Sequence, residues 1–202
     1  MEYKVEAVLA YKGDTVQIDF DCREPVFINS SVAYDFGVRP GKIMSDEQIE
    51  TMVSKNCYRR ARERALYLLD DRDYSYAEIF KKLAIGYPEQ ICYDVVNNLS
   101  ELGLIDDRRY AKRCAEYYLV KKLCGKYRAR EEMRRRGIPN ELIDEAILEY
   151  EDGTQKRLEE LISKKYSRKL KEEGGRQKVK AALARQGYSY DEINAALQDE
   201  EF

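Results

Sequence analysis

The sequence contains no histidine and no tryptophan, and it has only four prolines in 202 residues. Histidine is the usual general base of nucleophilic triads and the commonest metal ligand, so its absence argues against both kinds of site. The five cysteines are scattered and none forms a C-x-x-C pair, which leaves a zinc site without support. An odd, dispersed set of thiols is typical of a reducing cytosol. We therefore expect no cofactor and no metal.

Long apolar runs are also lacking. No stretch approaches the ~18 residues that span a membrane. The N-terminal residues, Met1 to Lys4, do not begin the apolar segment of a secretory signal. We expect a cytoplasmic protein with no membrane contact.

Catalytic motifs are missing as well. The sequence has no phosphate-binding P-loop, no G-x-S-x-G elbow and no EF-hand loop. A hydrolase that uses Asp106 and Asp107 is the remaining enzymatic alternative. Two carboxylates at a predicted helix start more often cap the helix, because anions favour its positive end. We therefore expect a protein that is not an enzyme.

Charge is plentiful but unevenly placed. Charged residues make up 37% of the chain, against roughly 25% in ordinary soluble domains. The net charge of −2 hides a basic middle: residues 1–53 carry −5, residues 54–136 carry +7 and residues 137–202 carry −4. A basic middle favours an anionic partner, either nucleic acid or an acidic protein surface. Salt-bridged helix faces would give the same composition.

The N-terminal region has the period of a β-hairpin. Apolar residues alternate with polar ones over residues 5–9 and 16–20, and Gly13 lies in the predicted turn between them. Residues 26–28 form a short apolar run that predicts a third strand. A short helix is expected over residues 29–36, ended by Gly37.

The rest of the chain repeats itself at a spacing of about 50 residues. Leu83, Met133 and Leu183 keep that spacing, and a glycine follows each of them, at Gly86, Gly137 and Gly187. An amphipathic segment follows each glycine, and a longer helix precedes each pair. The glycines are expected to end helices in the left-handed conformation. Such units bury their apolar faces on each other.

The sequence predicts a mainly α protein with three tandem three-helix repeats in an extended curved array, preceded by a small β-hairpin region. The expected domains are residues 1–44, 45–102, 103–151 and 152–202.

Local signals give the ends of several helices. The longer helices are expected over about 46–69, 107–123 and 154–170. Three capping boxes are predicted, in which a serine hydroxyl and a side chain three residues later exchange hydrogen bonds with the backbone. They pair Ser45 with Gln48, Ser75 with Glu78, and Ser189 with Glu192.

The feature most suggestive of binding is the run 121–136, which carries a net charge of +6. With Ala129 facing inward, Lys126, Arg130 and Arg134 form a stripe on one flank of the helix. Arginine holds phosphates or carboxylates with a bidentate fork. A solvated helix with local salt bridges, for example to Glu131 and Glu132, is the alternative. The predicted partner- or nucleic-acid-binding residues are Arg59, Arg60, Lys121, Lys122, Lys126, Arg128, Arg130, Arg134, Arg135 and Arg136.

Seventeen tyrosines accompany these cations. Tyrosines beside arginines can stack on unpaired bases. Half-buried packing with the hydroxyl in water is the commoner role, and we favour it here.

Several segments together resemble the RecX family of recombination regulators. Residues 104–111 (LIDDRRYA), Gly125 and residues 131–139 (EEMRRRGIP) resemble that family's I-D-D-x-x-[FY]-A stretch, its glycine and its E-L-x-x-K-G-[IF] stretch. Upstream, residues 65–78 resemble its first repeat. The fit extends over most of the chain, from about residue 16 to 197. Met133 replaces the usual leucine and Arg136 the usual lysine, each with the same chemical type.

The resemblance implies a function. RecX-like proteins bind the RecA recombinase, lodge in the groove of its filament on single-stranded DNA, and limit filament growth or strand exchange. They are cytoplasmic, need no cofactor, and have three-helix repeats similar to winged-helix or helix-turn-helix units; some bind DNA weakly. We accordingly expect a monomeric, non-enzymatic regulator that binds the RecA–DNA filament and inhibits it. An autonomous DNA-binding helical-repeat protein is the alternative.

Overall fold

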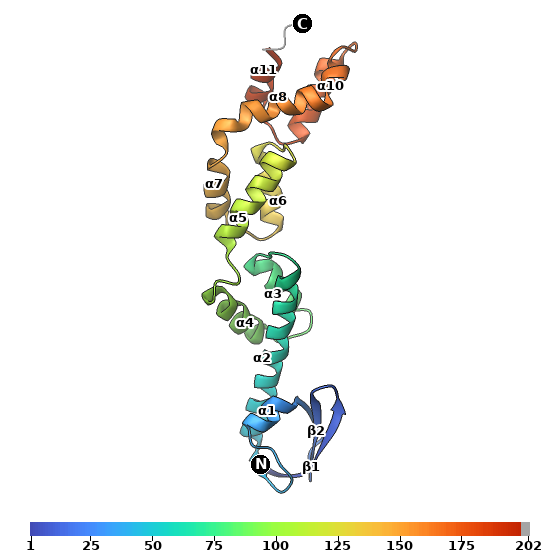
Figure 1. Ribbon diagram of the computed structural model, residues 1–202, viewed down its shortest axis with the longest axis vertical. Coiled ribbons are helices and arrows are strands. Elements are labelled where there is room, and N and C mark those ends of the chain that lie inside the picture. Colours follow the sequence, from blue (N-terminus) through green and yellow to red (C-terminus); the bar gives the residue numbers. More distant parts are fainter. Residues whose placement is uncertain (199–202) are drawn as a thin grey trace. The chain divides into compact units, whose positions relative to one another are not determined.

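The computed structural model describes residues 1–198 of a mainly helical chain that begins with a small antiparallel sheet. This confirms the predicted fold class. The chain divides into two compact units. The first contains residues 1–72 and 80–99, and the second contains residues 73–79 and the described residues from Ser100 onward (Figure 1).

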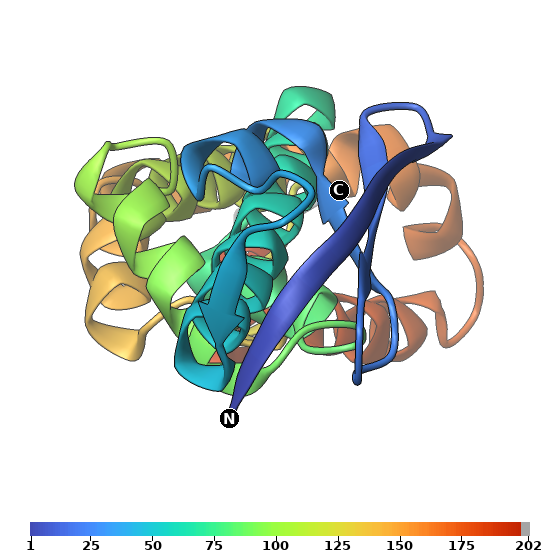
Figure 2. The same ribbon diagram turned by 90° about the horizontal axis from the view of Figure 1, so that it is seen from below.

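The sheet has the strand order β3-β2-β1-β4, and each neighbouring pair is antiparallel. Its hairpin turns at Gly13, which has a φ of +56°. Figure 2 shows β1, drawn in dark blue, as the long strand that starts at the N-terminus. The hairpin and the third strand were predicted, whereas the last strand was not. The strands are β1 (Glu2–Lys12), β2 (Thr15–Phe20), β3 (Val26–Asn29) and β4 (Ile43–Ser45).

Two helices complete the core of this region. Helix α1 (Ser30–Asp35) is capped by Asn29, and Gly37 follows it in the left-handed conformation. Helix α2 (Asp46–Asp71) begins at the predicted capping box, with both hydrogen bonds of the box present. The apolar face of α2 buries residues such as Ile49 and Met52 in one cluster with the inward side chains of the sheet.

The remaining helices follow the predicted repeats. Leu83, Met133 and Leu183 are all fully buried, as the 50-residue spacing requires. Residues 110–147 and 158–197 form two separate apolar clusters, which correspond to the second and third repeats. The helices are α3 (Tyr76–Leu83), α4 (Glu89–Glu101), α5 (Asp107–Ala115), the π-helix η1 (Glu116–Lys121), α6 (Lys126–Arg135), α7 (Asn140–Leu148), the 3-10 turn η2 (Glu151–Gly153), α8 (Thr154–Lys165), α9 (Ser167–Leu170), α10 (Gly175–Arg185) and α11 (Tyr190–Gln198).

Three details differ from the sequence-based expectation. The helix predicted over 107–123 changes from α to π geometry at Glu116. The helix predicted over 154–170 is interrupted at Tyr166, whose φ of −122° is not helical. Gly137 and Gly187 adopt the left-handed conformation, but the expectation of that conformation is wrong for Gly86.

Candidate partner-binding surface

The basic run lies mainly on α6, and main-chain contacts fix where this helix begins. The N–H of Gly125 donates to the carbonyl of Gln186 at 3.0 Å, and the N–H of Tyr127 donates to the carbonyl of Gly187 at 3.2 Å. A Cβ on Gly125 would lie 2.1 Å from the carbonyl oxygen of Gly187. The start of α6 and the end of α10 therefore touch backbone to backbone, within the second unit.

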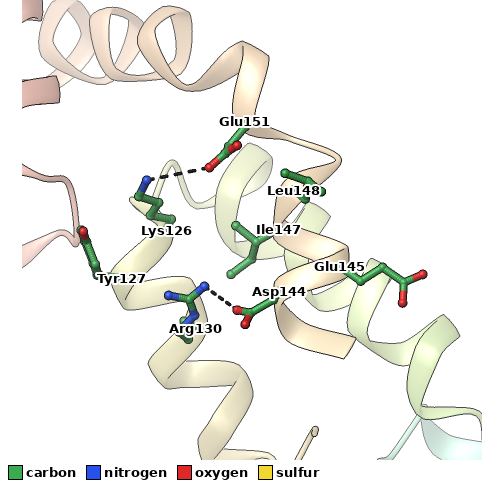
Figure 3. A pocket seen from close by; sticks show the side chains of 8 residues that line it. All are labelled: Lys126, Tyr127, Arg130, Asp144, Glu145, Ile147, Leu148 and Glu151. Atoms are coloured by element: carbon green, nitrogen blue, oxygen red, sulfur yellow. Dashed lines mark hydrogen bonds and ion pairs between the residues drawn. The ribbon is translucent and has the colours of Figure 1, made fainter. Parts of the chain in front are cut away.

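One flank of α6 faces α7 and the turn after it, as Figure 3 shows. Lys126 lies 3.9 Å from the carboxylate of Glu151, and Arg130 forms an ion pair with Asp144. These residues line a hollow of about 430 Å³ between α6 and α7. Lys126 and Arg130 therefore form local salt bridges, as the alternative interpretation of the basic run proposed. The Arg130 side chain is still 31% exposed.

Arg134, the third member of the predicted stripe, has a different environment. Its Nε donates to the side-chain oxygen of Asn140 at 2.8 Å. Among residues 1–198, no carboxylate forms an ion pair with Arg134. An amide orients the guanidinium without cancelling its charge.

Two further cations with neutral partners, Lys122 and Arg128, lie near Gln186. Arg128 donates to Gln186 Oε1 at 2.9 Å, and Gln186 Nε2 donates to the carbonyl of Lys122 at 3.4 Å. The ammonium of Lys122 lies 5.4 Å from the centre of the Tyr117 ring. Both cations are exposed, and neither pairs with a carboxylate among residues 1–198. This part of the surface carries positive charge available to an anionic partner.

The other predicted cations of the run are compensated. Lys121 lies 3.8 Å from the carboxylate of Glu116. Arg135 lies 3.4 Å from that of Glu131 and 3.6 Å from that of Glu132. Both cations remain exposed, but each carries its counter-charge on the same helical segment.

Arg136 is engaged inside the second unit. Its guanidinium donates to the hydroxyl of Tyr110 at 2.6 Å and to that of Tyr118 at 3.3 Å, and lies 3.7 Å from Glu78. Burial raises the pKa of Tyr110 to about 12, so the phenol remains a neutral hydrogen-bonding partner. The structure thus separates Arg136 from the exposed cations beside it in sequence.

The paired carboxylates before α5 have structural partners. Asp106 accepts the N–H of Arg109 at 2.9 Å, which is the capping role expected for it. Asp107 accepts the N–H of Tyr76 at 2.9 Å. Burial raises the pKa of the Asp107 carboxyl, and this hydrogen bond opposes the rise.

The two remaining predicted residues lie on α2, in the first unit. Arg59 forms an ion pair with Glu63 at 2.9 Å and donates to Asn29. Arg60 is exposed and lines two adjoining hollows together with Asn56. The sequence reasoning missed Asn56, although its signal is readable: it falls seven residues after Ile49, on the apolar face of α2.

Residues 1–198 contain no helix long and apolar enough to cross a membrane. They also contain no group of three or more cysteine, aspartate or glutamate residues placed to hold a metal ion.

Comparison with known proteins gives the family. The model of the second three-helix domain of RecX matches residues 106–147, and that of the third matches residues 152–197. A regulatory protein RecX of Mycolicibacterium vanbaalenii is 32% identical over 155 residues, covering 70% of this chain and 84% of the relative. The chain belongs to the RecX family. The similarity to RecX of Clostridioides difficile is longer: 27% identity over 187 residues, or 91% of this chain and 88% of that one.

Two solved RecX structures share the fold. One covers 98% of this chain and all of its own chain, with a TM-score of 0.74 and 24% identity. RecX from Lactobacillus salivarius covers 72% of this chain and 97% of its own, with a TM-score of 0.66 and 22% identity. Membership of this family makes the chain a regulatory protein.

Proposed function

We propose that this RecX-family protein regulates homologous recombination by binding the RecA filament on single-stranded DNA and inhibiting its ATP hydrolysis and strand exchange. It performs no catalysis of its own and acts in the cytoplasm, where RecA works. The observation that carries the proposal is the cluster at Gln186, where Lys122 and Arg128 keep uncompensated positive charge.

Placement supports the choice of these cations. Arg128 is tied to a side-chain amide and Lys122 lies against a tyrosine ring, so neither charge is cancelled within the chain. A cation held in place by a neutral group is oriented before it meets its partner, so less side-chain freedom is lost on binding. Arg134, held by Asn140, has the same property. The phosphates of filament DNA would suit these groups, as would carboxylates on the surface of RecA.

The experiment adds the purified protein to RecA filaments on single-stranded DNA and follows ATP hydrolysis and strand exchange. Both rates should fall as the protein approaches stoichiometric amounts. Unchanged rates at stoichiometric protein would refute the proposal.

The alternative, autonomous DNA binding, predicts a different result when the protein is mixed with DNA alone. It predicts tight binding to DNA without RecA, with an affinity that falls steeply as salt is added. The net charge of −2 disfavours such binding. Tight, salt-sensitive binding to DNA alone, together with no effect on RecA, would favour the alternative.

A further inference from the structure

The first unit contains a groove along the free edge of the sheet that none of the preceding functions uses. Two adjoining hollows of about 380 Å³ and 460 Å³ share three lining residues, Phe27, Asn56 and Arg60. Residues of β3 and α2 line both hollows. Tyr11, Lys12 and Thr15 of the hairpin complete the smaller one, and Gly86 and Tyr87 complete the larger one. We call the combined feature the β3 groove.

Asn56 is a buried amide with unused donors. Its side chain is about nine-tenths buried, at 7% relative exposure. Its Oδ1 accepts the N–H of Asn29 at 2.9 Å, whereas its Nδ2 has no hydrogen-bond partner among residues 1–198. Buried polar groups are rarely left unpaired, and an amide nitrogen can donate two hydrogen bonds. Asn56 lines both hollows, so an acceptor bound there would complete the hydrogen bonding of this buried amide.

Phe27 offers main-chain groups to the same space. Strand β3 pairs with β2, and the N–H of Ser30 donates to the carbonyl of Asp14 just before β2. The N–H of Asn29, one residue earlier, points away from β2 and donates to Asn56 on α2. Main-chain groups alternate in direction along a strand, so the N–H and C=O of Phe27 also point away from β2. Strand β3 is an edge strand, and an unpaired edge can bind an extended chain.

The charged lining favours an anion. Lys12 and Arg60 are the cations of the β3 groove, and neither forms an ion pair with another of residues 1–198. The carboxylate in the lining, Glu63, is already held by Arg59 at 2.9 Å. The groove therefore presents side-chain donors from Asn56 and Arg60 and lacks an uncompensated negative charge among its lining residues.

Apolar surface completes the groove. The ring of Phe27 is 46% exposed and packs against that of Tyr11, with centroids 4.8 Å apart. Val53, also partly exposed, and Tyr87 line the other end. An apolar side chain beside an anionic one would find a matching surface here.

We propose that the β3 groove binds an extended acidic peptide segment of another protein. The peptide backbone pairs with the N–H and C=O of Phe27. A carboxylate of the peptide accepts hydrogen bonds from Arg60 and from Nδ2 of Asn56, and a neighbouring apolar side chain packs on Phe27 and Val53. The lining residues of the β3 groove belong to the first unit and include none of the cations of α6, so peptide binding can be measured without RecA.

The test begins with the full-length protein on an array of ten-residue peptides. Each peptide carries one Asp or Glu among apolar residues, and the array places that residue at each of the ten positions in turn. Matched control peptides carry Asn, Gln or Lys at the same position. Binding peptides are then labelled with fluorescein and titrated by fluorescence anisotropy. We expect acidic peptides to bind and their controls not to bind.

Three variants connect the binding to the groove. Arg60→Glu should weaken the affinity about tenfold or more, because it replaces a charged hydrogen-bond donor with a repelling group. Phe27→Pro removes both the outward N–H and the exposed ring, at an edge position where proline is tolerated, and should also weaken binding. Arg64→Glu, on the same helix but outside the groove, should change the affinity less than twofold. Circular dichroism confirms that each variant folds.

Each other outcome contradicts the proposal. It fails if no acidic peptide binds at millimolar concentration, or if Arg60→Glu and Arg64→Glu behave alike. It also fails if a single-stranded oligonucleotide occupies the site in an Arg60-dependent way while acidic peptides do not. Loss of a dimer on Arg60→Glu, measured by sedimentation, would instead identify a second copy of the chain as the occupant.

Discussion

Individual glycines determine how closely the helices of the second unit approach. Gly187 combines a φ of +95° with direct contact to α6, since a Cβ there would lie 2.4 Å from the backbone nitrogen of Arg128. Gly174 has a similar φ of +67°, but a Cβ there would meet nothing within 4 Å. The two positions separate the cost of backbone strain from the cost of close contact.

Gly187→Ala should therefore destabilise the protein more than Gly174→Ala. The left-handed conformation costs a non-glycine residue about 1–2 kcal/mol, and this applies to both variants. The contact with α6 adds a further ~1–3 kcal/mol at residue 187 only. Urea unfolding measures both free energies. Equal losses would show that the contact between α6 and the end of α10 is not tight.

Asp107 gives a pH dependence at the same scale. Burial raises the pKa of its carboxyl above the ordinary 3.8, so the folded state holds the proton more tightly than the unfolded state does. The free energy of unfolding therefore falls as the pH rises from the ordinary pKa through the raised one.

Asp107→Asn should remove this contribution while keeping an oxygen to accept the N–H of Tyr76. The variant's stability relative to the natural protein should thus be higher at pH 7 than at pH 3, as measured by urea unfolding at both values. A relative stability that is lower at pH 7 would mean that the native structure favours the charged carboxylate.

At the scale of elements, three capping boxes begin helices, and they differ in one respect. Within residues 1–198, the hydroxyls of Ser45 and Ser189 form hydrogen bonds only inside their own boxes. Ser75 is fully buried, and its hydroxyl also donates to the carbonyl of Arg136, at the end of α6. One box therefore ties two helices together, whereas the other two serve a single helix each.

Replacing each serine by alanine should reveal that difference. Ser45→Ala and Ser189→Ala should cost about 1 kcal/mol, the usual loss of an N-cap. Ser75→Ala should cost a further ~1–3 kcal/mol, because it leaves a buried carbonyl without its donor. Thermal or urea unfolding of the three variants supplies the comparison, and three equal losses would rule out a structural role for the Ser75–Arg136 bond.

Helix starts and the repeat were predictable because their signals are local. The capping box at Ser45 is recognised from Gln48, three residues later. The repeat is recognised from the 50-residue spacing of Leu83, Met133 and Leu183, without knowledge of any tertiary contact. Strand β4 was missed because three residues are too few to show an alternating pattern. The π segment η1 was missed because apolar spacing hardly distinguishes a π turn from an α turn.

The candidate site was only partly predictable. The sequence placed a cluster of cations on α6, but the compensation of each charge depends on residues far along the chain. Arg136 meets Tyr110 and Glu78, and Arg128 meets Gln186, 58 residues away. Those partners distinguish a structural arginine from an available one, and no local pattern encodes them.

At the scale of the whole molecule, a net charge of −2 coexists with uncompensated cations in a basic middle region. Two pairs of exposed cations differ in whether their charge is compensated within the chain, so they allow a matched comparison of partner binding. Lys122 and Arg128 have neutral partners, whereas Lys121 and Arg135 already pair with Glu116, Glu131 and Glu132. Both pairs lie in the same basic run and have the same formal charge.

The most direct measurement compares the affinity of the natural protein and two double variants for RecA filaments on single-stranded DNA, by co-sedimentation at fixed salt. Lys122→Glu with Arg128→Glu should weaken binding at least about tenfold, as expected for the loss of charged contacts. Lys121→Glu with Arg135→Glu should weaken it less. If the second variant binds as weakly as the first, or if neither differs from the natural protein, the cations at Gln186 do not carry the interaction.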